Sequence, residues 1–460
     1  MSFDVQAYLR SLSRFGIKPG LDRIRAILAR LGDPQRRFPA VHIGGTNGKG
    51  STAAITAAVL SRAGYRVGLY TSPHLVRYNE RIRVDGAAIS DEELSAIFAE
   101  VAQAAAAVRE RLGSDPTEFE VGTAAAFLYF ARREVDVAVV EVGLGGRLDS
   151  TNVVHSAAVA ITPVSLDHTA VLGADLPTIA AEKAGIFRPG VPAVIAPQAP
   201  EAEAVFAAAA QRVGCPLVWV REVDEAALEN SKPAASSRGA YFRILSWGMD
   251  GGRLDVWTPE RSYRDVRVGL LGRHQVQNAA VAVSLLTVLA QRGFPIPEEA
   301  LRDGVAGARW PGRLELVPGR PNLLLDGMHN PAGAAALATS LERLLAGRRI
   351  LFVVGLMADR NPRDVLRPLL PHAAHVVATR PSSARTAPIA PEEIAQVANE
   401  LGVSSESAPT AKEALAAACR AAPPDGLVCV CGSLYLVGEV KGLLEAGWQP
   451  SQEERSAYAP

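Results

Sequence analysis

The stretch GGTNGKGST at residues 44–52 decides the fold, because it joins an apolar segment to a helix-forming one. The preceding FPAVHIGG (residues 38–45) is rich in apolar and branched residues, which favours a buried strand. The following KGSTAAITAAVLSRAG (residues 49–64) is rich in alanine and ends at a glycine, as helices often do. A strand, a glycine-rich turn and a helix in this order predict a loop that holds phosphate groups at the helix N-terminus.

This loop departs from the standard phosphate-binding pattern by one residue. In G-x-x-x-x-G-K-[ST] the hydroxyl residue directly follows the lysine, whereas here Lys49 is followed by Gly50 and then by Ser51. Lys49 still offers a charge to the β- and γ-phosphates, and Ser51 or Thr52 still offers a hydroxyl to Mg²⁺. The inserted Gly50 turns that hydroxyl by about 100° around the helix. A glycine-rich turn with a surface lysine is the alternative interpretation.

Strand and helix patterns alternate on both sides of a change in composition. The first series of strand candidates covers residues 66–73, 135–146, 157–164 and 191–198. The second series covers residues 321–327, 348–355, 374–380 and 426–433. Such alternation predicts an α/β fold with mostly parallel sheets that helices cover on both faces. The strands on either side of the polar segment 224–240 are expected to be antiparallel.

The length and the change in composition predict two domains. A chain of 460 residues is too long for one ordinary core. Prolines and glycines interrupt a short helix between residues 294 and 315, so we place the boundary at about residue 308. Residues 1–308 are expected to form an N-terminal P-loop-type domain with a mostly parallel sheet. Residues 309–460 are expected to form a smaller C-terminal Rossmann-like α/β domain.

Charge and composition exclude several classes of protein. The 48 basic and 48 acidic residues balance, so no overall field attracts nucleic acid or an anionic membrane. No apolar run is long enough to span a bilayer, and the N-terminus lacks a signal-peptide pattern. Four cysteines are too few for a disulfide framework, which favours a reducing compartment, the cytoplasm. Cys429 and Cys431 are expected to be buried thiols on a strand.

Polar side chains follow three of the predicted strands. Ser72 comes after the strand of residues 66–73, Glu141 ends an apolar run, and Asp167 and His168 follow residues 157–164. Ligands gather at the carboxyl ends of parallel strands. A serine, a glutamate and a histidine form a mixed oxygen and nitrogen set that suits Mg²⁺ beside phosphates. Structural pairing of Glu141 is the alternative.

Several longer motifs carry a resemblance to a known family. In chain order they are GTNGKGS, TSPHLVRYNERI, TEFEVGTAAAF, EVGLGGRLDSTN, LDHTAVLG, EKAGIFRPG, GRHQVQNAA, WPGRLE, DGMHNPAG and GSLYLVGEV. This series resembles folylpolyglutamate synthase and dihydrofolate synthase of the Mur ligase superfamily. The K-G-S spacing of the phosphate loop is itself a mark of that family.

The resemblance implies an ATP-dependent ligase for small-molecule substrates. A carboxylate of dihydropteroate or of a folate would take the γ-phosphoryl group of ATP, and the amine of L-glutamate would then displace phosphate from the acyl phosphate. A bifunctional enzyme is expected, which adds the first glutamate and also extends the tail. The alternatives are a folylpolyglutamate synthase alone or another Mur-type amino-acid ligase. A monomer is expected.

The resemblance also implies the roles of particular residues. Those that would bind the nucleotide are Asn47, Gly48, Lys49, Gly50, Ser51, Asn278, Arg313, Asp326 and His329. Those that would bind two Mg²⁺ ions are Ser51, Ser72, Glu141 and His168. Lys49, His168 and Arg313 would act in catalysis together with Lys183, which matches a lysine that is carbamylated in the family. From the residues alone, Lys183 is a salt-bridged helix lysine, Asn278 a helix hydrogen-bonder, and Asp326 and His329 turn formers.

The folate side of the site would be formed by three further segments. Its residues would be Gly20, Leu21, Asp22, Phe119, Gly122, Thr123, Asp149 and Ser150. Ser150 stands where the family has alanine. GLMADRNP at residues 355–362 is an altered family loop, which we expect to lie away from the chemistry.

Three other classes are weighed against this one. A peptidoglycan Mur ligase usually carries a nucleotide-sugar-binding domain before the phosphate loop, and only about forty residues precede the loop here. A regulatory GTPase needs a guanine-specifying N-K-x-D stretch, which the sequence lacks. A non-catalytic ATP-binding module requires that the Glu141 and His168 positions hold no metal.

Overall fold

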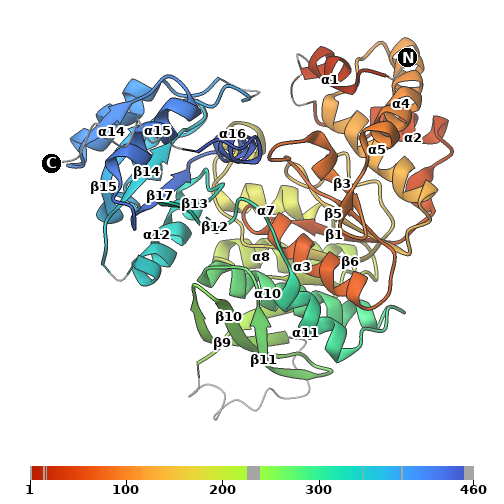
Figure 1. Cartoon of the computed structure of the whole chain (residues 1–460). Helices are drawn as coiled ribbons and strands as arrows, with labels where there is room; N and C mark the ends of the chain where they lie inside the picture. Colours follow the sequence, from red (N-terminus) through yellow and green to blue (C-terminus); the bar gives the residue numbers. More distant parts are fainter. Residues whose placement is uncertain are drawn as a thin grey trace.

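The computed structural model describes residues 3–13, 16, 18–224, 239–345, 347–384 and 387–449. Two β-sheets, each covered by helices, form two lobes that lie next to each other (Figure 1). The larger sheet contains the strands up to residue 268, and the smaller sheet contains the strands from residue 315 onward. The expected α/β class with mostly parallel strands is confirmed for both sheets.

The larger sheet has eleven strands in the order β11-β10-β9-β8-β7-β6-β1-β5-β2-β3-β4. These are β1 (Ala40–Gly44), β2 (Val67–Tyr70), β3 (Ile82–Val84), β4 (Ala87–Ala88), β5 (Val137–Glu141), β6 (Ser156–Ile161), β7 (Ala193–Ile195), β8 (Leu217–Glu222), β9 (Gly239–Gly248), β10 (Gly251–Trp257) and β11 (Ser262–Val268). The central strand β1 is parallel to both of its neighbours, β5 and β6.

The expectation of antiparallel strands around residues 224–240 is wrong for the nearest pair. Strand β8 is parallel to β9, and the antiparallel pairs are β9 with β10 and β10 with β11. A parallel pair needs a long connection rather than a tight hairpin, and the residues between β8 and β9 supply that length. Most of the polar segment itself, residues 225–238, lies outside the described residues.

Helices cover both faces of the larger sheet because successive strand residues point in opposite directions. Val137 and Val139 of β5 belong to the core under α3, α10 and α11, whereas Ala138 and Val140 belong to the core under α4 and α5. The helices of this lobe are α1 (Val5–Ser13), α2 (Asp22–Arg30), η1 (Pro34–Arg36), α3 (Lys49–Arg62), η2 (Tyr78–Arg81), α4 (Asp91–Leu112), α5 (Glu118–Arg132), α6 (Thr169–Leu172), α7 (Leu176–Ala184), α8 (Pro200–Val213), α10 (Arg273–Ala290) and α11 (Glu298–Gly307).

The smaller sheet has six strands in the order β12-β13-β17-β14-β15-β16, and β12 is its antiparallel member. Its elements are β12 (Glu315–Val317), β13 (Asn322–Leu325), α12 (Pro331–Leu345), β14 (Ile350–Val354), α13 (Pro362–Leu366), η3 (Leu370–His372), β15 (Ala373–Ala378), α14 (Pro391–Glu400), β16 (Ser405–Ser407), α15 (Ala411–Ala421), β17 (Leu427–Cys431) and α16 (Leu434–Glu445). Cys429 and Cys431 are buried free thiols on β17, as expected.

The chain passes from one lobe to the other along residues 308–314, directly after α11. Helix α11 packs closely on α3, the helix that follows the phosphate loop. The start of the linker is therefore anchored to the element that carries the loop. None of the described helices has the length and apolarity that a membrane crossing requires.

Candidate active site

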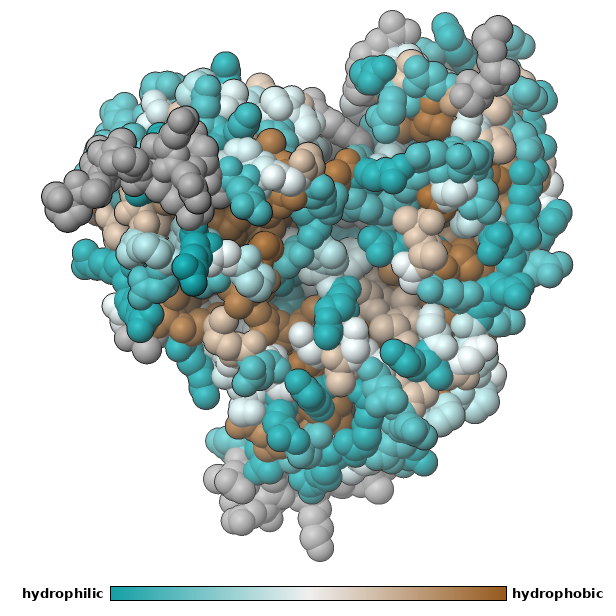
Figure 2. Space-filling view, viewed as in Figure 1, coloured by the Kyte–Doolittle hydropathy of each residue, from teal (hydrophilic) through white to brown (hydrophobic). Residues whose placement is uncertain are grey.

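A cavity of about 330 Å³ lies between the two lobes. In the space-filling view a recess separates the lobes (Figure 2). The larger lobe lines the cavity with the phosphate loop, residues 45–51, and with the ends of β2, β5 and β6. The site residues expected from the sequence that line it are Asn47, Gly48, Lys49, Gly50, Ser51, Ser72, Glu141, His168, Lys183, Asn278, Arg313, Asp326 and His329. The structure thus brings together every residue expected at the nucleotide and the metal.

The phosphate loop has the form that its sequence predicts. It joins β1 to α3, and Gly48 at the N-cap of α3 has a φ of 90°. A Cβ built on Gly48 would lie 2.4 Å from Oδ1 of Asn278, so a side chain at this position would collide with that amide. Asn278 is buried on α10 and donates to Gln275 Oε1 at 3.0 Å. The helix N-terminus and its glycines fit a phosphate chain.

Two lysine side chains meet at one carbonyl of this loop. The Nζ of Lys183 donates to the Gly45 carbonyl oxygen at 2.8 Å, and the Nζ of Lys49 donates to the same atom at 3.3 Å. Burial, followed by the charge of Lys49, lowers the pKa of Lys183 to about 7. Among the described residues Lys183 has no carboxylate within ion-pair distance, so the salt-bridge interpretation does not describe it.

Glu141 ends β5 inside the cavity. Its Oε2 accepts a hydrogen bond from the backbone N–H of Ser72 at 3.2 Å. Burial raises the pKa of Glu141, while Lys49, the Ser72 N–H and Arg313 oppose that rise. The carboxylate has no ion-pair partner within 4 Å among the described residues, which leaves it free to serve a cation in the cavity.

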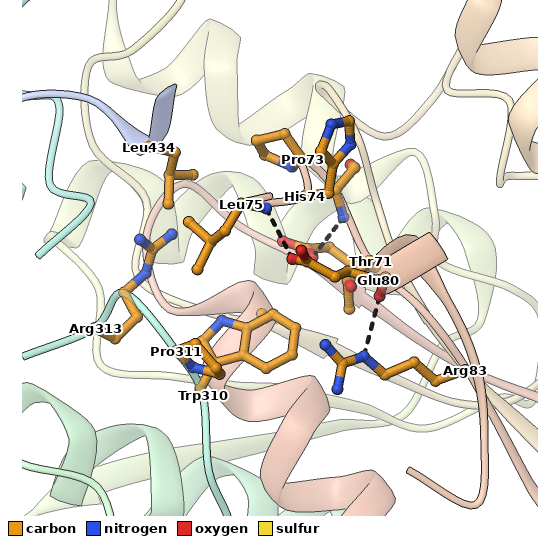
Figure 3. Close-up of a pocket in the computed structure, with 13 residues that line it drawn as sticks. Thr71, Pro73, His74, Leu75, Glu80, Arg83, Trp310, Pro311, Arg313 and Leu434 are labelled. Carbon is orange, nitrogen blue, oxygen red and sulfur yellow. Dashed lines mark hydrogen bonds between the residues drawn. The ribbon is translucent and has the colours of Figure 1, made fainter. Parts of the chain in front are cut away.

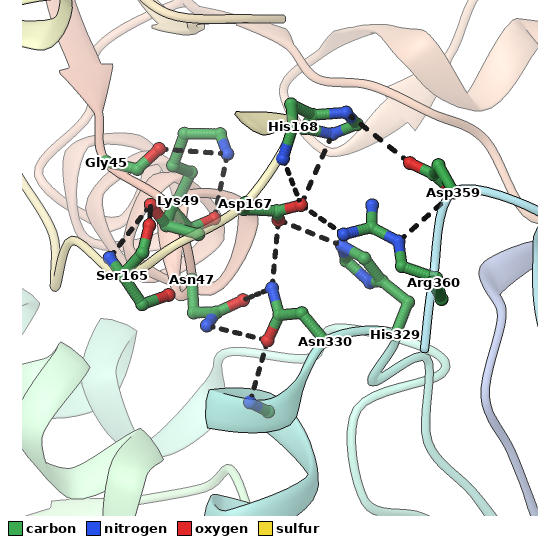
Figure 4. A network of polar contacts seen from close by, with 12 residues as sticks. Gly45, Asn47, Lys49, Ser165, Asp167, His168, His329, Asn330, Asp359 and Arg360 are labelled. Carbon is green, nitrogen blue, oxygen red and sulfur yellow. Dashed lines mark hydrogen bonds and ion pairs between the residues drawn. The ribbon is translucent and has the colours of Figure 1, made fainter. Parts of the chain in front are cut away.

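A polar network crosses the cleft at the end of β6 (Figure 4). Asp167 from the larger lobe forms a buried ion pair with Arg360 from the smaller lobe. Asn330 donates to Asp167 Oδ2 at 2.9 Å and exchanges two hydrogen bonds with Asn47, at 3.1 and 3.2 Å. The network therefore connects the phosphate loop to the smaller lobe.

The charges in this network affect two titratable groups. The pKa of Asp167 lies far below its ordinary value. Burial by itself would raise this pKa, but the hydrogen bond and charge of His329, together with the charges of His168 and Arg360, lower it by more. Burial lowers the pKa of His168, although Asp167 opposes this. A neutral imidazole is the form that binds a metal. In this structure Nε2 of His168 lies 3.8 Å from Oδ1 of Asp167, and Nδ1 of His168 lies 3.9 Å from Oδ2 of Asp359 (Figure 4).

The expectation that residues 355–362 lie away from the chemistry is wrong. Arg360 and Asp359 reach the end of β6 and stand beside His168. The loop directly follows β14, and its separation of 193 positions from Asp167 kept this proximity out of the sequence pattern. Asn330 was also missed, although it directly follows His329 in the motif DGMHNPAG.

The linker and the start of the smaller lobe supply the remaining wall. Arg313 is half-buried in the cavity wall, and desolvation lowers its pKa, while Asp326 and Glu141 oppose this. Asp326 accepts from the backbone N–H groups of Leu314 and Met328, both at 2.9 Å, so it also shapes the turn. His274, at the start of α10, lines the cavity with a buried Nδ1 that has no hydrogen-bond partner. His274 was not among the site residues expected from the sequence.

A second, smaller cavity of about 40 Å³ adjoins the first (Figure 3). The two share Gly50, Ser72, Pro73, Glu141, Arg313 and Leu434 in their walls. The smaller one is also lined by Thr71, His74, Leu75, Glu80, Arg83, Trp310 and Pro311. Among these, Trp310 and Pro311 come from the linker between the lobes.

The residues expected at the folate are not part of the cavity lining. Arg23 of α2 pairs with Glu120 of α5 at 3.0 Å, which brings the segment of Gly20, Leu21 and Asp22 next to that of Phe119, Gly122 and Thr123. Phe119 stacks on Tyr70, with ring centroids 6.1 Å apart. Thr123 shares a hydrogen bond with the Tyr70 hydroxyl at 3.2 Å.

Asp149 and Ser150 are buried in the loop after β5. Asp149 accepts from the N–H of Leu144 at 2.8 Å, from the N–H of Thr151 at 2.9 Å and from the Thr151 hydroxyl. His42 on β1 lies 2.8 Å from the same hydroxyl. Through these contacts Asp149 shapes the loop that lines the cavity at residues 142–145.

The comparisons with known proteins agree with this architecture. The Mur ligase middle domain matches residues 43–286, and the Mur ligase glutamate ligase domain matches residues 312–434. The fold and the site thus define an ATP-dependent ligase of the Mur type, an enzyme class that forms amide bonds. The dihydrofolate synthase/folylpolyglutamate synthase of Bacillus subtilis is 39% identical over 376 residues, which cover 81% of this chain and 84% of that protein.

Two solved structures extend the similarity over nearly the whole chain. Mycobacterium tuberculosis folylpolyglutamate synthase, complexed with ADP and AMPPCP, is 34% identical with a TM-score of 0.84 and covers 97% of this chain and 100% of that one. The bifunctional Yersinia pestis folylpolyglutamate synthase/dihydrofolate synthase, complexed with AMPPNP and Mn ion, is 32% identical with a TM-score of 0.79, covering 95% and 97%. The chain belongs to the folylpolyglutamate synthase/dihydrofolate synthase family of the Mur ligase superfamily.

Proposed function

We propose that this enzyme joins L-glutamate to dihydropteroate and to the γ-carboxyl group of folate glutamates, at the expense of ATP. The single observation that supports this most is the convergence of the phosphate loop, Glu141, Lys183 and Arg313 on one cavity between the lobes. The names of the relatives support the substrates, since they include folylpolyglutamate synthases and bifunctional enzymes.

The donor set of the cavity fits a nucleotide triphosphate with divalent metal. The N-terminus of α3 and Lys49 would hold the phosphates, with His329 beside them, while Asn278 and Asp326 would hold adenine and ribose. The buried, unpaired Nδ1 of His274 is a further polar group on this wall. In relatives the site accepts ADP, AMPPCP, and AMPPNP with Mn.

The metal-binding residues would be Ser51, Ser72, Glu141 and His168. In the part of the chain that the structure describes, no group of three or more His, Cys, Asp or Glu side chains is close enough to hold a metal by itself. Two such side chains with two hydroxyls fit Mg²⁺ ions that take their remaining oxygens from phosphate and water. Bound Mg²⁺ would neutralise phosphate charge during transfer.

The side chains of the cavity suit phosphoryl transfer followed by acyl transfer. A substrate carboxylate oxygen attacks the γ-phosphorus, the bond to ADP breaks, and Lys49 and Arg313 stabilise the charge that spreads over the phosphoryl oxygens. The glutamate amine then attacks the acyl carbon, loses a proton, and phosphate leaves. Positioning by both lobes excludes water from the acyl phosphate.

Lys183 fits a carbamate in this scheme. Carbamylation requires a neutral amine, and the buried Lys183 amine has a pKa of about 7. The reaction forms a bond between Nζ and the carbon of CO₂ and releases one proton. The product is a carboxylate-like group near the phosphate loop, where it would help to hold a second metal ion or orient the glutamate amine.

We extend the proposal to the pterin side of the site, to the two domains and to the cellular setting of the enzyme. Gly20, Leu21, Asp22, Phe119, Gly122, Thr123, Asp149 and Ser150 would form the pterin side of the site. Residues 1–308 and 309–460 would be the two domains, which agrees with the change of sheet after α11. The enzyme would work as a monomer in the cytoplasm, without nucleic acid or membrane partners.

A direct assay distinguishes the bifunctional enzyme from a folylpolyglutamate synthase alone. The purified protein is incubated with ATP, Mg²⁺ and L-glutamate, with either dihydropteroate or a reduced folate monoglutamate as acceptor. Formation of ADP and of the glutamylated product with both acceptors is expected. Turnover with the reduced folate alone leaves the monofunctional alternative, and turnover with neither acceptor contradicts the proposal.

A further inference from the structure

The residue that breaks the standard phosphate-loop pattern faces a tryptophan of the linker. A Cβ built on Gly50 would lie 2.8 Å from Nε1 and 3.0 Å from Cζ2 of Trp310. Side-chain carbons do not approach other atoms so closely, so residue 50 must be glycine while Trp310 stays where it is. The backbone of Gly50 is helical, in the first turn of α3, so the close approach and not the φ angle requires glycine.

Trp310 is held on both sides. It packs on the hydrophobic core that includes Val59 of α3, and it lines the smaller cavity beside Ser72 and Glu141. In Figure 3 its indole lies between the side chains of Arg313 and Arg83. The indole therefore fixes the point at which the linker leaves the larger lobe.

The linker continues directly into the cavity wall. Gly312 donates its N–H to Glu315 Oε2 at 2.7 Å, and its carbonyl accepts from the Gly327 N–H at 2.8 Å. These bonds attach the residue before Arg313 to the smaller lobe. Trp310 thus contacts the larger lobe and Gly312 contacts the smaller lobe. These two residues are only two peptide units apart.

We propose that Trp310 is a positioning residue that sets the place of Arg313 relative to the phosphate loop. Its indole sits in the space that Gly50 leaves open, which explains why a glycine stands between Lys49 and Ser51 in this chain. A larger residue at position 50 would push the linker, and Arg313 with it, away from the phosphates. This inference rests on the role proposed above for Arg313 in stabilising the transferred phosphoryl group.

A test exploits the fit of the Trp310 indole against the backbone of Gly50. The variants are Gly50→Ala, Trp310→Leu, Trp310→Phe and the double variant Gly50→Ala/Trp310→Leu, with kcat and the KM for ATP measured on the full enzyme. Trp310→Leu is expected to lower kcat about tenfold and to change the Kd of Mg–ADP less than twofold, because ADP lacks the γ-phosphate. Trp310→Phe keeps an aromatic spacer and is expected to retain most of kcat.

The double variant carries the decisive comparison. Gly50→Ala alone is expected to lose about tenfold or more in kcat/KM, and the added Trp310→Leu change is expected to return activity to the level of Trp310→Leu alone. The matched control is Gly50→Ala/Trp219→Leu, since Trp219 packs in the core beside α7 and α8. This control is expected to stay as impaired as Gly50→Ala.

Two results would overturn the inference. One is a kcat of Trp310→Leu equal to that of the wild type or of Trp310→Phe, which decides the matter even if Gly50→Ala does not fold. The other is a Gly50→Ala/Trp310→Leu variant no more active than the Trp219 control. Arg313→Ala tests the proposed role of Arg313 separately, since normal turnover of that variant refutes this role. Rescue of Gly50→Ala by Trp310→Leu reports the contact between Gly50 and Trp310 independently of Arg313.

Discussion

Lys183 and Lys49 donate to one and the same carbonyl oxygen, that of Gly45, at 2.8 and 3.3 Å. Burial of the Lys183 amine, and then repulsion by the Lys49 ammonium at the same acceptor, lower the pKa of Lys183 to about 7. The amine is therefore largely neutral above pH 7 and largely charged below it. Uptake of CO₂ needs the neutral form, so carbamylation should increase as the pH rises through 7.

The Lys183 prediction follows from this. Lys183→Ala should abolish ligation, and short carboxylic acids in solution should restore part of it by occupying the vacated space. Lys183→Arg keeps a positive charge but cannot be carbamylated, so it should be equally inactive. Nuclear magnetic resonance with ¹³C-labelled CO₂ should detect a carbamate in the wild type and none in either variant. Ordinary turnover of the arginine variant would show that the carbamate idea is wrong.

Lys49→Ala should remove most of the activity without unfolding the protein. The ammonium group of Lys49 contacts the carbonyl oxygens of Gly45 and Thr46 at the edge of the cavity, so little packing depends on it. We expect kcat/KM to fall by roughly 10³-fold or more, about 4 kcal/mol of transition-state stabilisation. Lys412→Ala, at an exposed position of α15, serves as the control and should be unchanged. Near-normal turnover of a folded Lys49→Ala enzyme would refute the phosphate-loop assignment.

Glu141→Gln keeps the shape of the side chain and removes its charge. The amide can no longer neutralise a cation, so we expect kcat/KM to fall by roughly 10²-fold and the Mg²⁺ concentration for half-maximal rate to rise about tenfold or more. Titration of the rate with Mg²⁺ at saturating ATP measures this directly. An unchanged Mg²⁺ dependence would mean that Glu141 is a structural carboxylate.

Asp167→Asn should weaken the contact between the two lobes and thereby lower the activity. The substitution removes the more buried of the two carboxylates that pair with Arg360, so that only the exposed Asp359 remains at 3.3 Å, and it weakens the acceptor for Asn330. We expect kcat/KM to drop by about tenfold or more, together with a lower melting temperature. Glu298→Gln removes an exposed ion pair with Arg302 and is the matched control. Equal kinetics for the two variants would contradict a role for the Asp167 network.

His42 gives a prediction about stability against pH. It is fully buried beside Thr151, and burial, followed by the charge of Arg188, lowers its pKa to about 3. The unfolded chain takes up a proton near pH 6.5 and the folded chain does not, so stability decreases as the pH falls from 6.5 towards 3. The loss between pH 7 and pH 5 should be about 2 kcal/mol from this residue. Urea unfolding of His42→Gln at both pH values should show a smaller difference than the wild type.

Much of the larger lobe could be predicted because its signals are local. Apolar runs such as Val137–Glu141 and the glycine turn before Lys49 determine a strand and a phosphate loop without reference to the rest of the chain. Lys49, Ser72, Glu141 and His168 follow from the phosphate loop and from strand ends, which the parallel arrangement brings to one edge of the sheet. The roles of Lys183, Asn278, Arg313, Asp326 and His329 were expected from the family resemblance alone. The direction of β9 was missed because it depends on how a long connection returns.

The contacts across the cleft could not be read from the sequence. Arg360 meets Asp167 over 193 positions, and Asn330 meets Asn47 over 283. Nothing in the local pattern around either partner indicates the other. The fit of Trp310 against Gly50 is of the same kind, since a missing Cβ has meaning only once the neighbour that fills its place is known. The folate residues form a neighbourhood, but their ligand contacts stay a prediction.

The chain crosses between its two sheets once, along residues 308–314, and in the described residues no strand of one sheet returns to the other. The molecule is therefore divisible at a single point into two pieces, each with a complete sheet and its own hydrophobic clusters. Neither piece alone lines the whole cavity, because the phosphate loop belongs to the first and Asp326 to the second. Catalysis therefore requires that the two pieces come together. The single crossing is the structural reason why two separately produced halves of this chain would complement each other.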